Sequence, residues 1–327
     1  MSSRIRIGIM GTGRIVARWI RDIAEADNAE VTAISSRDER RAREAAERYG
    51  IARFFGSYEA MLAADICDAV YIATPHAMHR DCAMLAMRAG KHVLCEKPVA
   101  PNAAQFREMA ACARENRVLL MEAMWTRFFP VTADVRQLAR SGAIGEARMI
   151  QADFSFFTPF ETQTRMFDPA QGGGALLDVG CYGVHYAMDI YGAAPEEVSG
   201  TAVLGESGVD EQAVLALRFP GGRVASVACG LRVSLPSIAR IHGTKGRIEV
   251  PNFWQPSGYD LTRNGETVHI PAKKHPPEGF AFEVKHFCEC VRQGLMESPV
   301  MSHADSLAAL EVMDAFRAQI GLRYPFE

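Results

Sequence analysis

The sequence contains no segment that is long and apolar enough to cross a membrane, because no apolar run in its 327 residues reaches about 18. It has no signal-peptide pattern either, since the first residues lead directly into a candidate strand. Internal repeats and low-complexity linkers are also missing. These absences predict a globular, cytoplasmic protein.

An excess of positive charge is absent as well. The 36 Lys and Arg residues face 39 Asp and Glu residues, which gives a formal net charge of −3. The basic residues form no block, and the cluster at 37–41 is diluted with acids. This balance excludes a strongly basic nucleic-acid-binding protein.

The eight cysteines lack the spacing of a metal site. Cys288 and Cys290 form the only close pair in the sequence, and on a helix their side chains would diverge. The others lie in apolar contexts, where cysteine usually acts as a small buried hydrophobe. We therefore expect free thiols in a reducing compartment.

At this length two domains are expected. The first 125 residues alternate short apolar runs with helical patterns. The predicted strands are 5–10, 30–35, 69–72, 92–95 and 119–122, and the predicted helices are 15–26, 40–49, 57–63, 77–89 and 103–116. This alternation predicts an α/β fold whose first domain, residues 1–125, is a doubly wound parallel sheet of the Rossmann type.

The pattern changes after residue 125. Strands are predicted at 148–156, 201–204, 213–219, 224–232, 239–242 and 247–250. Helices are predicted from the glycines at 172–174 through Tyr191, at about 281–293 and at about 304–320. Gly221 and Gly222, after Pro220, predict a hairpin turn. Few helices separate these strands, so the second domain, residues 126–327, is predicted to be an α/β domain on a large, mostly antiparallel sheet. Its last helices can pack back on the first domain.

A glycine-rich turn follows the first predicted strand. Gly11 and Gly13 stand between that strand and a helix, as in a dinucleotide-binding turn. The first glycine permits the tight turn, and the second lets the backbone approach a pyrophosphate at the helix N-terminus. The third position, usually Gly or Ala, is Val16, which departs from the pattern. The residues predicted to bind the cofactor here are Gly11, Thr12, Gly13, Arg14 and Ile15.

The end of the second predicted strand bears on the choice between NAD and NADP. An NAD site places an acidic residue about 20 residues after the glycines, where it holds the ribose 2′-hydroxyl. Ser36 and Arg37 stand there instead. A hydroxyl and a planar guanidinium suit a 2′-phosphate, which predicts NADP as the cofactor and disfavours NAD. The alternative is an ordinary helix N-cap followed by a polar helix start.

Lys97 follows the predicted strand at 92–95, in the segment Cys95-Glu96-Lys97-Pro98. Ligands of nucleotide-binding parallel sheets lie at the carboxyl ends of the strands, so a lysine at such an end is predicted to point at the cofactor. The alternative is a solvated surface lysine after an edge strand. Pro98 and the upstream glycine turn favour the cofactor role.

Five segments together carry a family resemblance that covers essentially the whole chain. They are the glycine turn, Ala-Thr-Pro-His-Ala-Met-His at 73–79, Cys-Glu-Lys-Pro at 95–98, Met-Glu-Ala-Met-Trp-Thr-Arg-Phe-Phe-Pro at 121–130 and Gly-Gly-Gly-Ala-Leu-Leu-Asp-Val-Gly-Cys-Tyr at 172–182. The sequence resembles the glucose–fructose oxidoreductase and inositol dehydrogenase (Gfo/Idh/MocA) family. Within it, the sequence is most similar to the branch of dimeric dihydrodiol dehydrogenases and NADP-dependent D-xylose dehydrogenases.

The resemblance implies a Rossmann domain and an α/β domain whose open sheet often forms the subunit interface, and hence a homodimer. It also implies that Lys97 and Tyr182 are the catalytic pair. The chemistry agrees, because oxidation of a secondary alcohol or hemiacetal needs hydride transfer to the nicotinamide and removal of one proton. A phenol has a pKa of about 10. An ammonium and the cationic nicotinamide would lower that pKa, so Tyr182 is predicted as general acid/base and Lys97 as its electrostatic partner.

Asp178 stands four residues before Tyr182 and would share its helix face. We predict that it orients the substrate or Lys97, and the alternative is a favourable charge in the first helical turn. Inositol-type relatives carry histidine at the position of Tyr182. His185, one turn further on, is expected to be secondary.

The loop after the strand at 69–72 completes the predicted cofactor-binding set, which also includes Thr74, Pro75, His76, His79 and Glu96. No metal site is predicted, because two histidines without a third ligand are weak evidence for zinc. The resemblance implies that His76 and His79 lie beside the nicotinamide. Metal binding or helix capping is the alternative for both.

Aromatic residues of the second half are candidates for the walls of a substrate pocket, because aromatic rings stack on the apolar face of a sugar or a cyclic diol. The predicted substrate-binding set is Trp125, Arg127, Phe154, Asp178, Tyr182 and Trp254. The aromatic members can equally be ordinary core residues, with Trp125 the least so. Arg127 can bind a hydroxyl or form a structural ion pair with Glu122 or Asp178.

The predicted function is therefore an NADP-dependent oxidoreductase that acts on an aldopyranose such as D-xylose or on a trans-dihydrodiol. One alternative is an aldose–ketose oxidoreductase that keeps its NADP tightly bound. A second is a nucleotide-binding regulator without catalysis, which the presence of both Lys97 and Tyr182 argues against.

Overall fold

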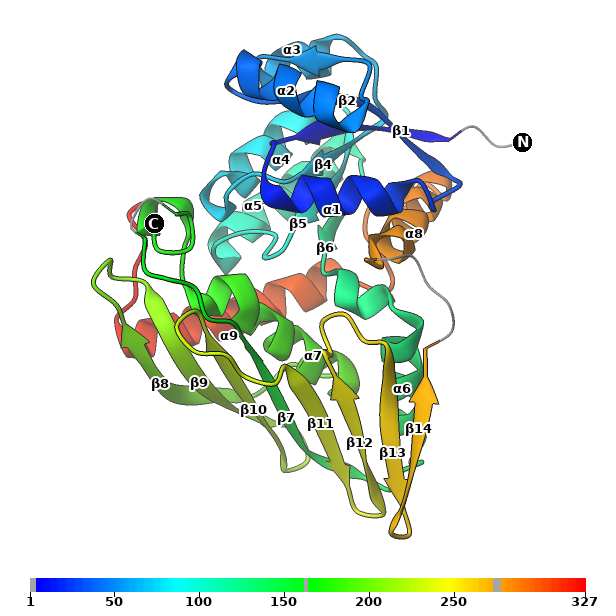
Figure 1. The fold of residues 1–327 in the computed structure, drawn as a ribbon, viewed down its shortest axis with the longest axis vertical. Helices are drawn as coiled ribbons and strands as arrows, with labels where there is room; N and C mark the ends of the chain where they lie inside the picture. Colours follow the sequence, from blue (N-terminus) through cyan, green and yellow to red (C-terminus); the bar gives the residue numbers. More distant parts are fainter. Residues whose placement is uncertain (1–3, 162–163, 273–277) are drawn as a thin grey trace. The chain divides into compact units, whose positions relative to one another are not determined.

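The computed structural model describes residues 4–161, 164–272 and 278–327. Contacts divide the chain into two compact units, and the second segment of each unit comes from the C-terminal part of the chain. The first unit contains Met1–Trp125 and His275–Ser306, and the second contains Thr126–Lys274 and Leu307–Glu327. Figure 1 labels their helices and strands. No helix among the described residues is long and apolar enough to span a bilayer.

A six-stranded, wholly parallel sheet forms the core of the first unit, in the order β3-β2-β1-β4-β5-β6. Its strands are β1 (Ile5–Met10), β2 (Ala29–Ser35), β3 (Phe54–Phe55), β4 (Ala69–Ile72), β5 (His92–Glu96) and β6 (Leu120–Ala123). Its helices are α1 (Arg14–Ile23), α2 (Glu39–Tyr49), α3 (Tyr58–Ala63), α4 (His79–Arg88), α5 (Ala103–Asn116) and α8 (Phe280–Arg292). This order is the doubly wound one, and the predicted Rossmann fold is confirmed.

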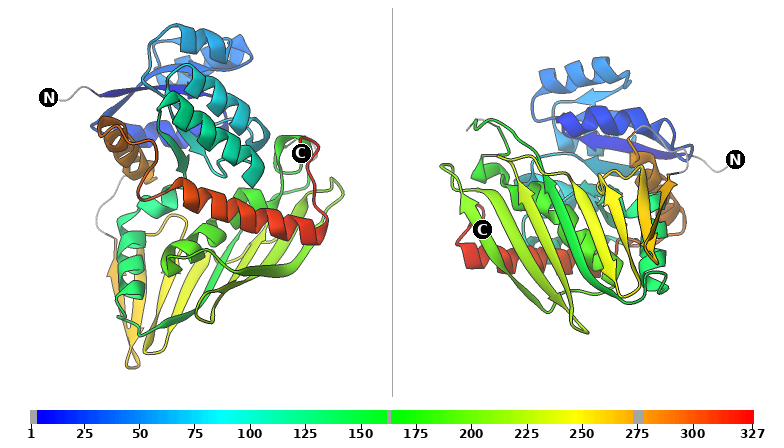
Figure 2. Two further views of the ribbon diagram at one scale, coloured as in Figure 1. Left: turned by 180° about the vertical axis from the view of Figure 1, so that it is seen from behind. Right: turned by 60° about the horizontal axis from the view of Figure 1, so that its bottom comes forward.

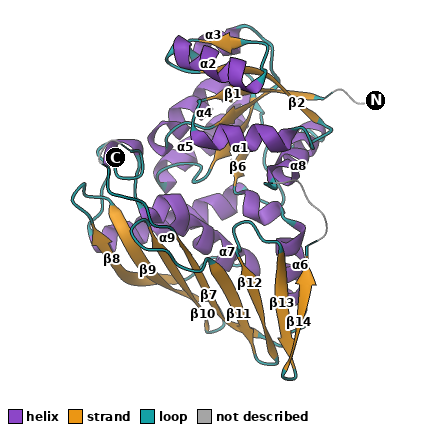
Figure 3. Ribbon diagram, viewed as in Figure 1, coloured by secondary structure: helices purple, strands orange, loops and turns teal. Residues whose placement is uncertain are grey.

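The strands form because short apolar runs are buried on both faces. All four residues of β4 are buried, as are the last four of β1. Trp19 of α1 stacks on Tyr71 of β4, with ring centroids 4.2 Å apart and planes 8° apart. Helices alternate with these strands along the chain (Figure 3).

The segment around α8 belongs to the first unit because a buried carboxylate holds it there. Asp22, at the end of α1, is fully buried and accepts the backbone N–H groups of Glu278 at 3.0 Å and Phe280 at 2.7 Å. Arg18 and Arg21 pair with the side chain of Glu278. A buried charge must be paired or hydrogen-bonded, and here it caps the start of α8.

An eight-stranded sheet forms the core of the second unit, in the order β14-β13-β12-β11-β7-β10-β9-β8. Its strands are β7 (Ala147–Ser155), β8 (Glu197–Leu204), β9 (Asp210–Phe219), β10 (Arg223–Gly230), β11 (Ile238–Gly243), β12 (Gly246–Pro251), β13 (Gly258–Arg263) and β14 (Glu266–Pro271). All neighbours are antiparallel except β7 and β10. The predicted mostly antiparallel sheet is confirmed, including the hairpin between β9 and β10.

Helices cover one face of this sheet. They are α6 (Pro130–Arg140), α7 (Cys181–Tyr191) and α9 (His303–Ile320), of which α9 begins within the first unit. Strand residues toward the helices are buried, among them Ile150, Leu215 and Val227. Figure 2 shows the opposite face, which no helix of the described residues covers.

Four elements of the structure have no counterpart among the predicted ones, namely β3, α6, β13 and β14. Strand β3 has only two residues, too few for a periodic pattern. Helix α6 begins with Pro130 in its first turn, a recognised start signal. β13 and β14 flank Asn264 and Gly265, both at positive φ, and Asn-Gly is the strongest short hairpin signal.

Candidate active site

The turn after β1 has the geometry of a phosphate-binding loop. Gly11 has φ +110°, and a Cβ there would lie 2.5 Å from the carbonyl oxygen of Ala73, so only glycine fits. Gly13 differs, because its φ is −69° and a Cβ would meet only that oxygen, at 3.5 Å. The chain's own fold does not require glycine at position 13. A ligand that approaches this backbone closely does, and this fits a dinucleotide pyrophosphate.

The N-terminus of α1 is open to such a ligand. Gly13 is its N-cap, no side chain caps the first turn, and the first turn contains no acidic residue. The first N–H groups of a helix need acceptors and carry a partial positive charge. Gly13 and Arg14 are exposed, and Ile15 is half-buried. The residues present therefore fit an anionic cofactor.

Ser36 and Arg37 follow β2, and the N-cap of α2 is Asp38, which accepts the N–H of Arg41 at 3.2 Å. The Ser36 hydroxyl accepts the N–H of Asp38 at 3.3 Å, so its own proton remains available for donation. Arg37 is exposed and lines a pocket of about 730 Å³ within the first unit. These two residues can hold a phosphate without giving up a helix cap.

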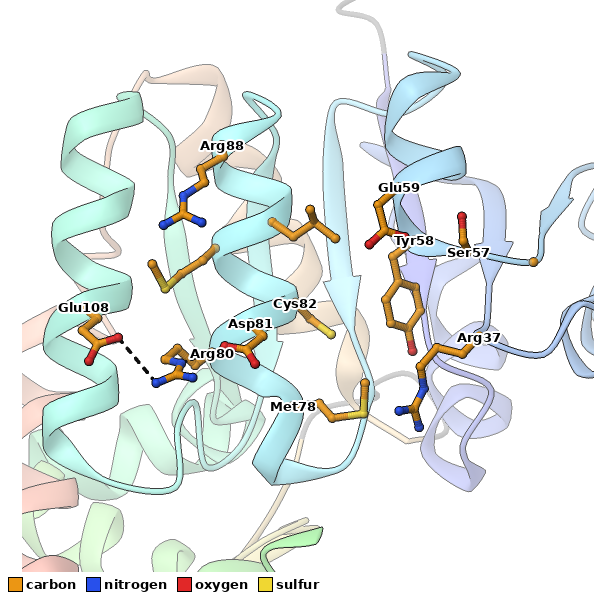
Figure 4. Close-up of a pocket in the computed structure, with 13 residues that line it drawn as sticks. Arg37, Ser57, Tyr58, Glu59, Met78, Arg80, Asp81, Cys82, Arg88 and Glu108 are labelled. Carbon is orange, nitrogen blue, oxygen red and sulfur yellow. Dashed lines mark hydrogen bonds and ion pairs between the residues drawn. The ribbon is translucent and has the colours of Figure 1, made fainter. Parts of the chain in front are cut away.

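This pocket extends along α4 from the end of β2 (Figure 4). Arg37 and Met78 lie at one end and Arg88 at the other, while Tyr58 and Cys82 line the middle. Burial raises the pKa of Tyr58 to about 12, although the charge of Arg37 opposes that shift. The phenol is therefore neutral at physiological pH and presents an apolar ring beside Arg37.

Two loops at the carboxyl end of the parallel sheet are linked by His79. Its ring nitrogens lie 2.8 Å from the carbonyl oxygen of Pro98 and 3.0 Å from that of Thr74. His79 is fully buried and His76 is 5% exposed, with the two rings edge to face. Among the described residues, no group of three or more His, Cys, Asp or Glu could hold a metal ion.

Lys97 is half-buried at the end of β5, and the Lys97–Pro98 peptide bond is cis. Its backbone N–H donates to Glu96, whose side chain also accepts the hydroxyl of Tyr71 at 2.5 Å. The next N–H, of Val99, donates to the buried Glu122 at 3.1 Å. Sequence reasoning missed Tyr71 and Glu122 as supports, because only the fold brings them to this loop.

In the second unit, Tyr182 is the second residue of α7, directly after the π-helical turn Leu176–Gly180. Such turns are rare and frequent at functional sites. Tyr182 is 6% exposed. The helix approaches the sheet closely, because a Cβ at Gly183 would lie 2.5 Å from Cγ1 of Val227 on β10. A similar Cβ at Gly180 would lie 2.9 Å from Sγ of Cys229.

Three of the predicted substrate-binding residues come together here. Phe154 of β7 lies edge to face with Tyr182, with ring centroids 5.2 Å apart. Trp254 stacks on Phe154, with centroids 5.0 Å apart and planes 6° apart. Both Phe154 and Trp254 are half-buried, so part of this aromatic surface is open beside the phenol. A flat apolar surface next to a phenol suits a ring-shaped alcohol.

The remaining predicted residues have structural partners. Asp178, in the π-helical turn, accepts a hydrogen bond from Arg165 at 2.9 Å. Arg127 pairs at 3.0 Å with the buried Asp189, a partner that the sequence analysis did not consider. His185, also on α7, is 2% exposed.

Trp125 packs in the core of the first unit. It is 3% exposed, and its ring stacks on Phe280 with centroids 4.1 Å apart and planes 7° apart. The guanidinium of Arg18 lies over the ring, 5.5 Å from its centroid. These contacts tie the end of the first segment of this unit to α1 and α8.

Comparisons with known proteins agree over both halves of the chain. Residues 5–124 match the Gfo/Idh/MocA model described as an oxidoreductase family with an NAD-binding Rossmann fold, and residues 132–249 match the C-terminal domain model of the same family. The trans-1,2-dihydrobenzene-1,2-diol dehydrogenase of Xenopus laevis is 38% identical over 327 residues, which cover 97% of this chain and 98% of the relative.

Two solved structures have the same fold, and their sequences are less similar to this chain than that of the Xenopus laevis relative. An aldose-aldose oxidoreductase from Caulobacter crescentus, complexed with glycerol, superposes with a TM-score of 0.88 at 27% identity and covers 95% of this chain and 96% of its own. A 3-ketoreductase from Actinomadura kijaniata, in complex with NADP and TDP-benzene, has a TM-score of 0.86 at 30% identity. That alignment covers 97% of this chain and 98% of the ketoreductase.

Proposed function

The chain belongs to the Gfo/Idh/MocA oxidoreductase family, and from that premise we propose that it is an NADP-dependent dehydrogenase of a trans-dihydrodiol or of an aldopyranose such as D-xylose. The observation that carries the proposal is the placement of the Tyr182 phenol against the half-buried, stacked rings of Phe154 and Trp254. A cyclic diol or a pyranose can lay its apolar face on those rings while one hydroxyl meets the phenol.

Tyr182 is the general acid/base in this proposal. In the oxidative direction its phenolate oxygen takes the proton of the reacting hydroxyl, and in reduction the phenol returns it. The nicotinamide, when bound, supplies the acceptor for the hydride that leaves the same carbon. We propose that Lys97 of the first unit stabilises the phenolate of Tyr182, because a positive charge favours the ionised form of a phenol.

The other predicted residues keep supporting roles. The cofactor is held by residues of the first unit, with Gly11, Gly13 and the open N-terminus of α1 at the pyrophosphate and with Ser36 and Arg37 at the 2′-phosphate. The loop residues Thr74, Pro75, His76, His79 and Glu96 are proposed to border the same cofactor. Asp178 orients the substrate.

Arg127 and Trp125 contribute indirectly in this proposal. The ion pair of Arg127 with Asp189 fixes the end of α7 that lies away from Tyr182. Trp125 packs against Phe280, so its role is to order the core of the first unit.

A second candidate is an oxidoreductase that keeps NADP bound and reduces one sugar while it oxidises another. The likeness to an aldose-aldose oxidoreductase favours it. The two functions differ in one simple observation. A cycling enzyme copurifies with nucleotide that gel filtration does not remove, whereas a dehydrogenase releases it.

A homodimer through the open face of the second sheet is part of the proposal. That face exposes Met149 to 38%, Val214 to 51% and Val224 to 40%, which is unusual for a sheet surface in water. The measurement is the mass in solution by light scattering, and a monomer at micromolar concentration would contradict it. Eight free, buried cysteines support a reducing, cytoplasmic location.

A substrate screen tests the proposed function. Purified protein is assayed with trans-1,2-dihydrobenzene-1,2-diol, D-xylose and other aldopyranoses, and the formation of NADPH from NADP and of NADH from NAD is measured for each. We expect turnover of a diol or a pyranose with NADP. Turnover of acyclic alcohols alone would contradict the role of the aromatic surface, and no turnover of any sugar or diol would contradict the proposal as a whole.

A further inference from the structure

A buried aspartate caps the helix that carries Tyr182. Asp210, the first residue of β9, is fully buried, and its Oδ2 accepts the backbone N–H of Leu176 at 2.6 Å. Leu176 opens the π-helical turn that leads to Tyr182, and the residue before it, Ala175, offers no side-chain cap. Asp210 therefore supplies, from a distant strand, the acceptor that an N-cap side chain normally provides.

The third glycine of the Gly172–Gly174 segment makes room for this carboxylate. Gly174 has φ +113°, and a Cβ there would lie 2.2 Å from Oδ1 of Asp210. The hydroxyl of Tyr324 donates to the carbonyl oxygen of the neighbouring Gly173 at 2.6 Å. The loop before the catalytic helix is thus held by one residue of β9 and one of the C-terminal segment.

Three further groups face Asp210 electrostatically. Arg317 of α9 is 4% exposed and favours the charged carboxylate, and its own position is fixed by Glu327 and Asp314 at 2.7 Å each. The other two groups are Tyr324, in the C-terminal segment, and Cys229, on β10, and both are buried. Burial and the negative charge of Asp210 both raise the pKa of each of them. When Asp210 is ionised, the groups that stabilise its charge are a helix N-terminus and the guanidinium of Arg317.

We infer that Asp210 is a positioning residue for Tyr182, which it orients by anchoring the N-terminal end of the π-helical turn and α7. The inference rests on the proposed function, since it assumes that Tyr182 is the acid/base. An ionised carboxylate is a stronger acceptor for N–H groups than a neutral carboxyl or amide. The charge also complements the positive end of the helix.

The ionisation of Asp210 gives this role a characteristic pH dependence. Burial raises the pKa of Asp210 to about 7, while its backbone hydrogen bonds and Arg317 pull it down. The anchor is therefore weakened by protonation as the pH falls through about 7. The free energy of unfolding changes with pH in the opposite direction. A carboxyl whose pKa is raised on folding stabilises the folded protein at low pH, and this contribution is lost as the pH rises through the folded pKa.

Asp210→Asn tests the inference, because it keeps the shape and removes the charge. Turnover of trans-1,2-dihydrobenzene-1,2-diol with NADP, or of D-xylose if the screen prefers it, is measured from pH 5.5 to 8.5. We expect the ratio of variant to wild-type kcat to be about 0.1 at pH 8.5 and to rise toward one at pH 5.5, with the Kd for NADP within about twofold. The melting temperature of the variant relative to wild type should rise over the same interval.

If Asp210 had only a structural role, the substitution would lower stability and turnover together. A kcat ratio that falls with rising pH while the relative melting temperature rises would exclude such a role. Asp168→Asn is the matched control, because Asp168 caps another short helix of the same unit by accepting the N–H of Ala170 at 2.9 Å. Its kcat ratio should not change with pH. If Asp210→Asn does not fold, Tyr324→Phe loosens the same loop and should lower kcat about threefold.

A kcat ratio near one at every pH, or an unchanged kcat in Tyr324→Phe, would overturn the inference. The proposed function is judged separately, by Tyr182→Phe. If that variant is inactive while the Asp210 ratio stays flat, only the positioning role fails. If Tyr182→Phe is active, the assignment of the base fails first.

Discussion

Helix α7 lies so close to β10 that the effect of Gly183→Ala on stability should depend on the residue at position 227. The substitution should destabilise the wild type and stabilise a variant that has alanine at position 227. A Cβ at Gly183 would lie 2.5 Å from Cγ1 and 3.2 Å from Cγ2 of Val227, but 3.4 Å from its Cβ. Only the two methyl groups of Val227 are therefore in the way. Gly183→Ala should overpack this contact in the wild type and fit well when Val227 is also alanine.

The magnitudes follow from two opposing effects. Alanine in a helix is favoured over glycine by about 1 kcal/mol. Overpacking of a buried contact costs about 1–3 kcal/mol, so Gly183→Ala should lower the free energy of unfolding by about 1 kcal/mol in the wild type. In the Val227→Ala background the clash is removed, and the same substitution should raise the free energy of unfolding by about 1 kcal/mol.

The assay is a double-mutant cycle by urea denaturation, with the wild type, both single variants and the double variant. Val227→Ala alone should cost about 2 kcal/mol, because it deletes two buried methyl groups. The cycle should then give a coupling of about 2 kcal/mol between the two positions. Equal effects of Gly183→Ala in both backgrounds would refute the close approach of α7 to β10.

Three further predictions concern the cofactor, the base and the core of the second unit. Wild-type kcat/KM with NADP should exceed that with NAD by about tenfold or more, and Arg37→Asp should abolish or reverse this ratio; an unchanged ratio contradicts the assignment. Lys97→Met should move the apparent pKa of alcohol oxidation upward, because the phenolate of Tyr182 loses a positive neighbour, and Lys97→Arg should retain more of the pKa effect than of the rate; a slow Met variant with an unshifted profile means that the lysine only positions ligands. Asp189→Asn should lower the free energy of unfolding by about 3 kcal/mol, since three arginines lose their shared carboxylate, whereas Glu197→Gln on an exposed ion pair should cost below about 1 kcal/mol.

The fold of the first unit was largely predictable, because its strands are short apolar runs that local sequence patterns are enough to recognise. The alternation of strands and helices predicted the doubly wound sheet, and the glycine turn predicted its ligand-binding edge. The hydrophobic periodicity of the sequence could not assign α8 to this unit. That assignment depends on Asp22, a single buried carboxylate about 260 residues away in sequence from the amides that it binds. Local patterns carry no information on such a contact.

The site was predictable to a smaller degree. The roles of Tyr182 and Lys97 stay predictions, which rest on the resemblance and, for Lys97, on its place at the end of a strand. The stacking of Phe154 on Trp254 arises only when β7 and the loop after β12 come together. Asp210 carried no signal at all, because it follows Val209 at the start of an ordinary alternating strand. Its importance lies in the amide it reaches on another element.

The measurement that tests the central claim most directly is the turnover of Tyr182→Phe, with NADP affinity measured in parallel. The variant removes one hydroxyl and little volume, so the Kd for NADP should stay within about twofold of the wild type while kcat falls by about 10²–10⁴-fold. A variant that retains more than about a tenth of wild-type kcat would contradict the account. His185, one turn along the same helix, would then be the first residue to examine as the base.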